Sequence, residues 1–153
     1  MTSAVPDSVD DLPEYQVNLT PDGLRNLLGP ERAEALFRMP EAIGAPRGEA
    51  PEQIDIFLRK YSPQTRPYIT FHADTCDYTV NIALSEDSGN EGGKLLALYD
   101  GALKDVPRLT GTAVLHAGNL VHGVSRIERG TRYSLILFFS FSHRQNSAAP
   151  ARQ

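Results

Sequence analysis

The feature that most limits the fold of this chain is a series of short apolar segments, separated by turn residues, between Gln53 and Phe141. The first of them, Ile54 to Leu58, alternates in period two, as a half-buried strand does. We count about seven or eight such strands at close spacing, a number and spacing typical of a β-sandwich or a double-sheet barrel. Because no helical pattern separates the strands, the sequence does not predict a parallel α/β architecture.

Two short helices are predicted before the strands. Thr20-Pro21 places a hydroxyl at the N-cap and proline at the first helical position, and Gly29-Pro30 ends that helix. The second helix is expected over Glu31 to Met39, with Pro40 ending it and a loop over residues 40–52. The predicted fold class is mainly β, with two short N-terminal helices.

Length and composition limit the domain organisation and the partners. A chain of 153 residues suits one domain, expected over 16–142, with a disordered arm at 1–15 and a disordered tail at 143–153. The formal charge of −4 argues against a nucleic-acid partner, and no segment is long and apolar enough for a membrane span. The start of the chain lacks the pattern of a secretory signal and Cys76 is the only cysteine, so the predicted compartment is the reducing cytoplasm.

The candidate metal ligands begin in the segment Tyr68–Asp77. In an extended backbone His72 and Asp74 point to the same face, where an imidazole and a carboxylate can bind one metal ion. His122, on a later apolar segment, is the third candidate. Two histidines and one carboxylate that leave open positions are typical of non-haem Fe(II) oxygenases. The alternative for His72 is a structural histidine that hydrogen-bonds inside a barrel.

A second histidine competes with His122 for the third position. His116 lies six residues earlier, so strand parity does not distinguish the two. A hairpin turn at Glu128–Gly130 would pair the strand of His122 with the strand that begins at Arg132, which favours His122. We therefore predict that His122 binds the metal and that His116 is structural.

Arg132 and Ser134 share one face of the last apolar segment and suit a particular cosubstrate. A 2-oxo acid chelates Fe(II) through its keto oxygen and first carboxylate, so its distal carboxylate needs a separate cationic partner. A guanidinium pairs with a carboxylate through two parallel hydrogen bonds, and a serine hydroxyl adds a third donor. The alternative is an arginine at the barrel rim that pairs with Glu128.

Several motifs occur in one order along residues 54–141 and together resemble a known family. The order is similar to that in the catalytic domain of procollagen lysyl hydroxylases and, more distantly, of prolyl 4-hydroxylases, both of them Fe(II)/2-oxoglutarate oxygenases. The motifs are Tyr61-Ser62-Pro63, His72-x-Asp74-x-x-x-x-Thr79-x-Asn81-Ile82-Ala83-Leu84, Glu91-Gly92-Gly93, Leu115-His116-x-Gly118-x-Leu120, His122-Gly123 and Arg129-Gly130-Thr131-Arg132-Tyr133.

The resemblance implies a double-stranded β-helix, or jelly roll. It implies that the iron ligands are His72, Asp74 and His122. It also implies that 2-oxoglutarate is bound by a set of residues led by Arg132. The others in that set are Ser134, Tyr61, Thr79 and Asn81.

The expected function is that of a 2-oxoglutarate-dependent dioxygenase that hydroxylates an unactivated C–H bond. The expected substrate is an amino-acid side chain, either free, in a peptide or on a carrier, and O2 is the oxidant. Succinate and CO2 are the expected co-products, and ascorbate is a candidate addition to Fe(II) and 2-oxoglutarate. The alternative is a non-enzymatic or degenerate jelly-roll module that binds metal or a small acid.

Overall fold

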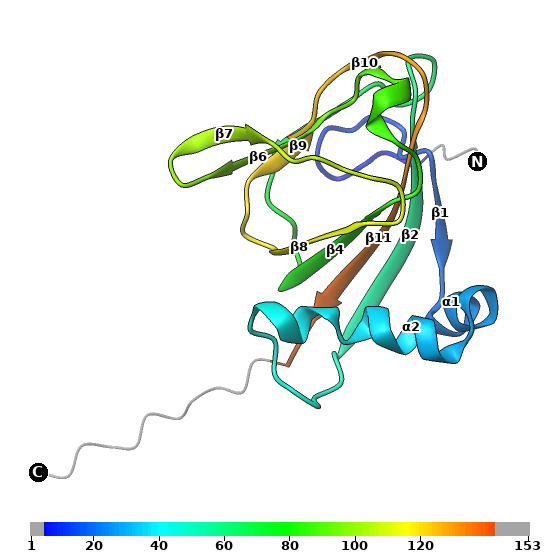
Figure 1. Cartoon of the computed structure of the whole chain (residues 1–153), viewed down its shortest axis with the longest axis vertical. Helices are drawn as coiled ribbons and strands as arrows, with labels where there is room; N and C mark the ends of the chain where they lie inside the picture. The colour runs from blue at the N-terminus through cyan, green and yellow to red at the C-terminus, as the bar shows by residue number, and fades with distance from the viewer. Residues whose placement is uncertain (1–4, 143–153) are drawn as a thin grey trace, which may run out of the picture.

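The computed structural model describes residues 5–142, which form two facing antiparallel sheets and a helical segment (Figure 1). The prediction of a mainly β fold with two short N-terminal helices is confirmed. The tail predicted for residues 143–153 lies outside the described residues. No helix within residues 5–142 is long and apolar enough to cross a membrane.

The larger sheet has five strands. Its order is β1 (Gln16–Leu19), β2 (Gln53–Tyr61), β11 (Arg132–Ser140), β4 (Tyr78–Ala83) and β8 (Ala113–Ala117). The long strands β2 and β11 lie side by side at its centre. Each neighbour in this sheet runs antiparallel to the next.

The smaller sheet has four strands, and a separate two-stranded pair accompanies it. Its order is β3 (Ile69–His72), β9 (His122–Val124), β6 (Leu95–Tyr99) and β7 (Ala102–Asp105), and β10 (Ile127–Arg129) pairs with β5 (Glu91–Gly92). Strand β7 forms a hairpin with β6, and Asp100 and Gly101 lie in the turn between them. Strand β9 and strand β10 are separated by residues 125–126.

The helices form where the capping residues predicted them. Thr20 caps α1 (Pro21–Leu28) by accepting a hydrogen bond from the Gly23 amide at 3.0 Å. The second helix, α2 (Pro30–Phe37), ends two residues earlier than expected. The predicted loop then opens with a short 3₁₀-helix, η1 (Met39–Ile43), because proline fits the first turn of a helix. In Figure 1 these helices lie below β2, β4 and β11.

The helices cover one face of the larger sheet and close the main core. Leu24 of α1 and Phe37 of α2 are buried against alternate residues of three strands. The cross-strand register aligns Leu137 of β11 with Ile56 on one side and Val80 on the other, so these positions share the covered face. The sequence predicted a half-buried β2, but Phe57 on its other face is also buried, because that face lines the space between the two sheets.

The second face of the larger sheet carries the polar residues that the sequence analysis selected. Tyr61 is paired with Arg132, and Thr79 with His116, in the strand register. This face meets apolar residues of the smaller sheet. The cluster between the sheets consists of Tyr61, Ile69, Leu95, Val124 and Ile127.

The predicted hairpin between the strands of His122 and Arg132 is wrong. Strand β9 pairs with β3 and β6, whereas β11 pairs with β2 and β4 in the other sheet. Gly130, with a φ of +96°, turns the chain from β10 into the larger sheet. His122 and Arg132 therefore belong to different sheets.

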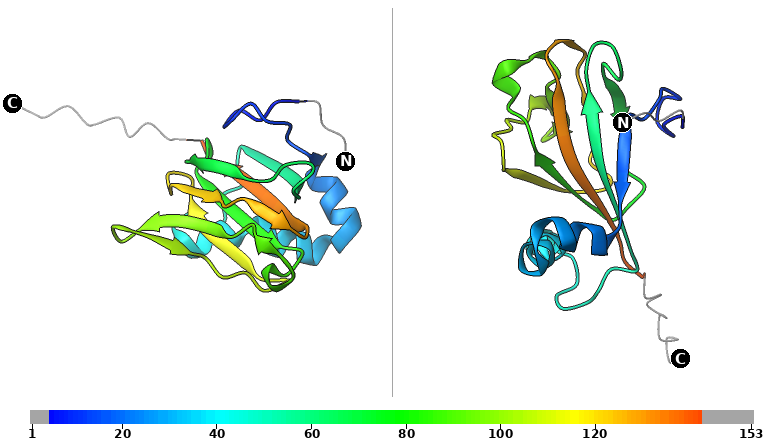
Figure 2. Two further views of the ribbon diagram at one scale, coloured as in Figure 1. Left: turned by 90° about the horizontal axis from the view of Figure 1, so that it is seen from above. Right: turned by 90° about the vertical axis from the view of Figure 1, so that its right-hand side faces the viewer.

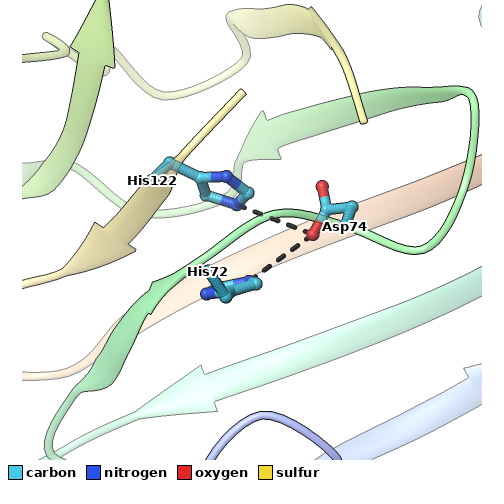
Figure 3. A group of neighbouring side chains, drawn as sticks. All are labelled: His72, Asp74 and His122. Carbon is cyan, nitrogen blue, oxygen red and sulfur yellow. Dashed lines mark ion pairs between the residues drawn. The ribbon is translucent and has the colours of Figure 1, made fainter. Parts of the chain in front are cut away.

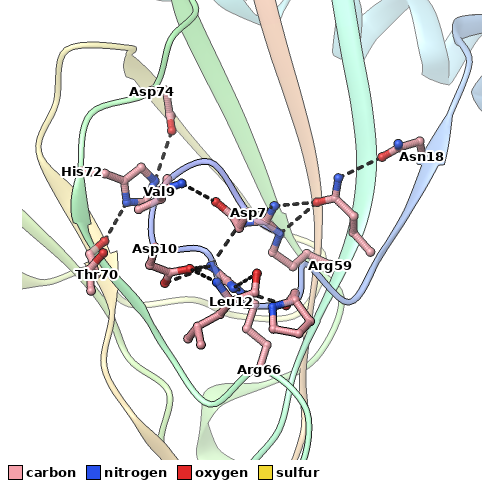
Figure 4. Close-up of polar contacts among 12 residues, drawn as sticks. Asp7, Val9, Asp10, Leu12, Asn18, Arg59, Arg66, Thr70, His72 and Asp74 are labelled. Carbon is pink, nitrogen blue, oxygen red and sulfur yellow. Dashed lines mark hydrogen bonds and ion pairs between the residues drawn. The ribbon is translucent and has the colours of Figure 1, made fainter. Parts of the chain in front are cut away.

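A disordered arm was predicted over residues 1–15; residues 1–4 lie outside the described residues, and the segment 5–15 packs against the rest of the domain. Figures 1 and 2 show it in dark blue, toward the end of the strands opposite the helices. Asp7 is only 3% exposed and pairs with Arg59 at 2.9 Å and Arg66 at 3.3 Å, and Asp10 also pairs with Arg66 (Figure 4). Two buried arginines need anionic partners, and this segment supplies both carboxylates.

Candidate active site

His72, Asp74 and His122 lie together between the two sheets (Figure 3). His72 is the last residue of β3, and His122 the first of β9, directly opposite it in the register. Asp74 lies in the loop after β3, so the prediction that it shares a strand with His72 is wrong. The loop nevertheless returns its carboxylate to the face of His72.

Gly118 allows the loop of Asp74 to pack closely against the end of β8. The Asp74 amide donates to the Gly118 carbonyl at 2.8 Å, and the Gly118 amide donates to the Asp77 carbonyl at 2.8 Å. A Cβ atom at position 118 would collide with the carbonyl oxygen of Cys76. The absence of a side chain at Gly118 therefore helps to position Asp74.

Backbone carbonyls set the tautomer of both histidines. The Nδ1 atom of His72 lies 2.7 Å from the Thr70 carbonyl, and that of His122 lies 3.0 Å from the Leu120 carbonyl. Because a carbonyl oxygen only accepts, Nδ1 carries the proton in each ring and Nε2 retains its lone pair. This is the arrangement in which an imidazole binds a metal through Nε2.

The distances between the three side chains fit a metal ion. Asp74 Oδ1 lies 3.5 Å from His72 Nε2 and 3.8 Å from His122 Nε2, and all three donor atoms lie within 4.8 Å of one another. Metal–ligand bonds of about 2.1 Å bring neighbouring donors to about 3 Å, so small side-chain movements complete the site. Two imidazoles and one carboxylate suit a divalent iron with open positions for other ligands.

The electrostatics of the three groups keep the carboxylate charged. Burial raises the pKa of Asp74, but the hydrogen bond with His72 and the charge of His122 outweigh it and leave that pKa below its ordinary value. Burial lowers the pKa of His122, which favours its neutral, metal-binding form. Burial also opposes charging of His72, yet its bond with Asp74 raises the His72 pKa overall.

His116 also approaches this site, from the other side of Asp74. Its Nε2 atom lies 3.9 Å from Asp74 Oδ2, and its Nδ1 lies 2.9 Å from the Ala117 carbonyl. Asp74 Oδ2 already accepts a 2.6 Å hydrogen bond from the Thr79 hydroxyl. The oxygen that faces both His72 and His122 is Oδ1, so His116 lies outside the group whose donor atoms converge.

Arg132 is fully buried, which excludes the alternative of a rim arginine paired with Glu128. Its Nη1 donates to the Gly93 carbonyl at 2.5 Å, and its guanidinium lies 5.6 Å from the centre of the Tyr61 ring. Its Nε and Nη2 have no hydrogen-bond partner within residues 5–142. Burial, followed by the nearby charge of Arg108, lowers the pKa of Arg132 to about 10, so it remains charged at neutral pH.

The other predicted cosubstrate residues share the inner face of the larger sheet with Arg132. Tyr61, Thr79 and Asn81 line a small cavity of about 30 Å³ together with the three candidate ligands. Ser134 is fully buried and follows Arg132 on the same face of β11, as the sequence predicted. A larger groove of about 360 Å³ reaches His72 and Asp74 from the side of the N-terminal segment, past Phe57 and Phe138.

Sequence reasoning missed two buried charged residues near Arg132. Arg108, in the link between β7 and β8, donates to the Ser134 hydroxyl oxygen at 2.9 Å. Asp87, in the short 3₁₀-helix η2 (Asp87–Gly89), pairs with Arg108 at 3.5 Å. Both lie in irregular segments, where no periodicity indicates which side chains point inward.

Comparison with known proteins finds sequence similarity to 2-oxoglutarate-dependent oxygenases. No family model matches the chain. Over 106 residues it is 31% identical to the 2-oxoglutarate and iron-dependent oxygenase domain-containing protein 2 of Xenopus tropicalis, which covers 61% of this chain and 28% of that protein. Over 90 residues it is 36% identical to procollagen-lysine,2-oxoglutarate 5-dioxygenase 1 of Mus musculus, which covers 56% of this chain and 12% of that protein.

A solved structure supports the fold. A prolyl hydroxylase from Trichoplax adhaerens, in complex with a peptide fragment of the hypoxia inducible factor oxygen degradation domain, superposes with a TM-score of 0.63. The match covers 91% of this chain and 70% of the other at 14% sequence identity. The chain spans less than a third of the length of the two sequence relatives. By sequence, part of the chain is similar to 2-oxoglutarate- and iron-dependent oxygenases, among them a procollagen lysine hydroxylase, and its fold is similar to that of a prolyl hydroxylase.

Proposed function

We propose that this chain is an Fe(II)- and 2-oxoglutarate-dependent dioxygenase that hydroxylates an unactivated C–H bond. In this proposal His72, Asp74 and His122 hold the iron, and Arg132 holds the distal carboxylate of 2-oxoglutarate. Succinate and CO2 are the co-products, and the expected substrate is an amino-acid side chain.

The observation that carries the proposal is the pair of unpartnered donors on Arg132. Its Nε and Nη2 are buried and have no hydrogen-bond partner in the part of the chain that the structure describes. An unpaired buried donor costs about 1–3 kcal/mol, and more when it is charged. A carboxylate accepts two parallel hydrogen bonds from a guanidinium, so it satisfies both atoms at once.

The remaining residues prepare the site for these two ligands. When bound, iron and 2-oxoglutarate supply the oxidising chemistry, and the protein supplies orientation and a shielded space. Thr79 fixes Asp74 Oδ2, so that Oδ1 is directed to the histidines. The carboxylate of Asp74 occupies the ligand position that a halide would need, which disfavours halogenation.

The proposed substrate is a class of compounds, an amino-acid side chain, and not a single compound. Two named relatives support an amino-acid side chain in a peptide: one acts on procollagen lysine by its name, and the Trichoplax adhaerens hydroxylase was solved with a peptide. A free amino acid or a carrier-bound one fits the same reaction. The cytoplasmic location and the benefit from ascorbate remain predictions from the sequence.

The test measures succinate. The chain is incubated with Fe(II), ascorbate, O2 and 2-oxoglutarate, with and without pools of amino acids and peptides, and products are searched for the gain of one oxygen atom. We expect succinate formation that a substrate in one pool increases and that Asp74→Ala abolishes. Metal and 2-oxoglutarate binding without succinate under any condition would favour the non-enzymatic module instead.

A further inference from the structure

A second buried guanidinium lies next to the proposed carboxylate site. Arg108 is 4% exposed, and its Nη2 donates to the Ser134 hydroxyl oxygen at 2.9 Å and to the Ile82 carbonyl at 3.4 Å. Among the described residues, its Nε and Nη1 have no hydrogen-bond partner. Arg108 therefore contacts a predicted cosubstrate residue and, like Arg132, retains unpaired donors.

A buried carboxylate accompanies the two arginines. Asp87 is 6% exposed, and its Oδ1 lies 3.5 Å from Arg108 Nη1 without a hydrogen bond. The charges of Arg108 and Asp87 both reach Arg132: Arg108 lowers the Arg132 pKa, and Asp87 raises it. Asp105 also acts on Arg132, but it is exposed, so solvent screens its charge.

The charges in this buried cluster do not cancel. Two guanidiniums and one carboxylate leave one positive charge, which matches the single negative charge of a distal carboxylate. Without Arg108, Asp87 would balance the charge of Arg132, and the cluster would have no charge left for an incoming anion. An uncompensated charge in a buried site requires a partner, so the balance decides whether the site attracts a carboxylate.

Arg108 also determines what the Ser134 hydroxyl can do. Since the Ser134 oxygen accepts a hydrogen bond from Arg108, the hydroxyl proton is free to be donated to another acceptor. The pocket therefore gains a neutral donor beside the two charged ones. Neither effect requires Arg108 itself to touch the cosubstrate.

We infer that Arg108 is a positioning residue of the cosubstrate pocket: it neutralises Asp87 and orients Ser134, which leaves Arg132 to bind the distal carboxylate of 2-oxoglutarate. The inference rests on the proposed function. It adds a residue pair, Arg108 with Asp87, that the resemblance to the lysyl hydroxylases does not supply.

The test measures equilibrium binding rather than turnover. Calorimetry without O2, on the Fe(II)-loaded chain, compares 2-oxoglutarate with 2-oxopentanoate, which has the same chelating end but no distal carboxylate. The variants are Arg108→Met, Asp87→Asn and the double variant. Arg129→Met serves as a control because it removes an exposed guanidinium, which pairs with the exposed Glu91.

We expect Arg108→Met to weaken 2-oxoglutarate binding by about 30-fold or more and to leave 2-oxopentanoate binding unchanged. The double variant restores the single positive charge of the buried cluster. Its 2-oxoglutarate affinity should be at least about tenfold higher than that of Arg108→Met. Asp87→Asn alone binds 2-oxoglutarate at least as tightly as the unmodified chain. Arg129→Met binds both ligands normally.

Two results would overturn the inference while leaving the proposed function intact. One is Arg108→Met with unchanged preference for 2-oxoglutarate over 2-oxopentanoate. The other is a folded double variant that binds no better than Arg108→Met. If Arg108→Met does not fold, the Asp87→Asn variant tests the inference instead. A loss of more than about tenfold in its 2-oxoglutarate affinity would contradict the charge balance. An unmodified chain that binds neither acid would refute both proposals.

Discussion

Thr79 Oγ donates a 2.6 Å hydrogen bond to Asp74 Oδ2, while the other carboxylate oxygen of Asp74 faces His72 and His122. Thr79 belongs to β4 of the larger sheet, and both histidines belong to the smaller sheet. The carboxylate therefore lies between the sheets: Thr79 holds Oδ2 by a hydrogen bond, and Oδ1 is left pointing to the two Nε2 atoms. This contact gives Thr79 a role beside the cosubstrate contact that the sequence predicted, which stays a prediction.

The first prediction concerns this hydrogen bond. Thr79→Val preserves the shape of the side chain but removes the donor, so Asp74 loses one restraint and Fe(II) binding weakens by about five- to tenfold. Thr79→Ser keeps the hydroxyl and should bind iron normally. Iron titration of the two variants measures the difference. Equal iron affinity in both would show that the contact does not position Asp74.

The second prediction decides between the two candidate histidines. His122→Ala removes a donor atom from the group around Asp74 Oδ1 and should abolish tight Fe(II) binding and succinate formation. His116→Gln removes a ring near Asp74 Oδ2, which Thr79 already occupies, so iron binding should persist at a reduced level. Iron titration with succinate assays distinguishes them. An active His122→Ala beside an inert His116→Gln would reverse the assignment.

The third prediction separates cosubstrate binding from metal binding. Arg132→Gln removes the buried guanidinium, and the loss of a hydrogen-bonded charge pair costs about 2–5 kcal/mol, or roughly 30-fold to several-thousand-fold in 2-oxoglutarate affinity. Fe(II) affinity should change little. Arg132→Lys keeps the charge without the planar pair of donors. Its 2-oxoglutarate affinity should therefore lie between that of the unmodified chain and that of Arg132→Gln. A collapse of iron affinity with normal 2-oxoglutarate binding would make Arg132 structural.

Local patterns predicted the parts of this molecule that depend on local rules. Thr20-Pro21 marked the start of α1, and the alternation along the last strand placed Arg132 and Ser134 on one face. The fold class followed from the spacing of the strands, and the motif order resembled that of oxygenases to which part of the chain is similar. In each case the relevant interaction is between residues close in the sequence or repeats with a fixed period.

Such local patterns did not predict which strands pair with each other. Glu128–Gly130 has the composition of a hairpin turn, but the strand before it pairs with β5, and β11 pairs with the distant β2. Partner choice depends on burial across the whole domain, which a turn signal does not contain. Arg108 and Asp87 were missed for a related reason, since their burial results from how irregular segments pack around Arg132.

The last prediction concerns the N-terminal segment, whose composition suggested disorder. Asp7 is buried against Arg59 and Arg66, and removing one partner of a buried ion pair typically costs about 3–5 kcal/mol. We expect Asp7→Ala to lower the free energy of unfolding by about 3 kcal/mol, the low end of that range. The loss is limited because Gln16 still accepts a hydrogen bond from Arg59 and Asp10 still pairs with Arg66.

Urea unfolding of the unmodified chain and of Asp7→Ala measures this loss in the free energy of unfolding. Asp22→Ala is the matched control, because the Asp22–Arg25 pair is exposed on α1 and its loss should leave stability unchanged within error. The loss in Asp7→Ala should come with easier proteolysis between residues 5 and 15, since the segment loses an anchor to the sheet. If Asp7→Ala is as stable as Asp22→Ala, the segment is not held by its ion pairs, and the groove beside His72 has no fixed wall on that side.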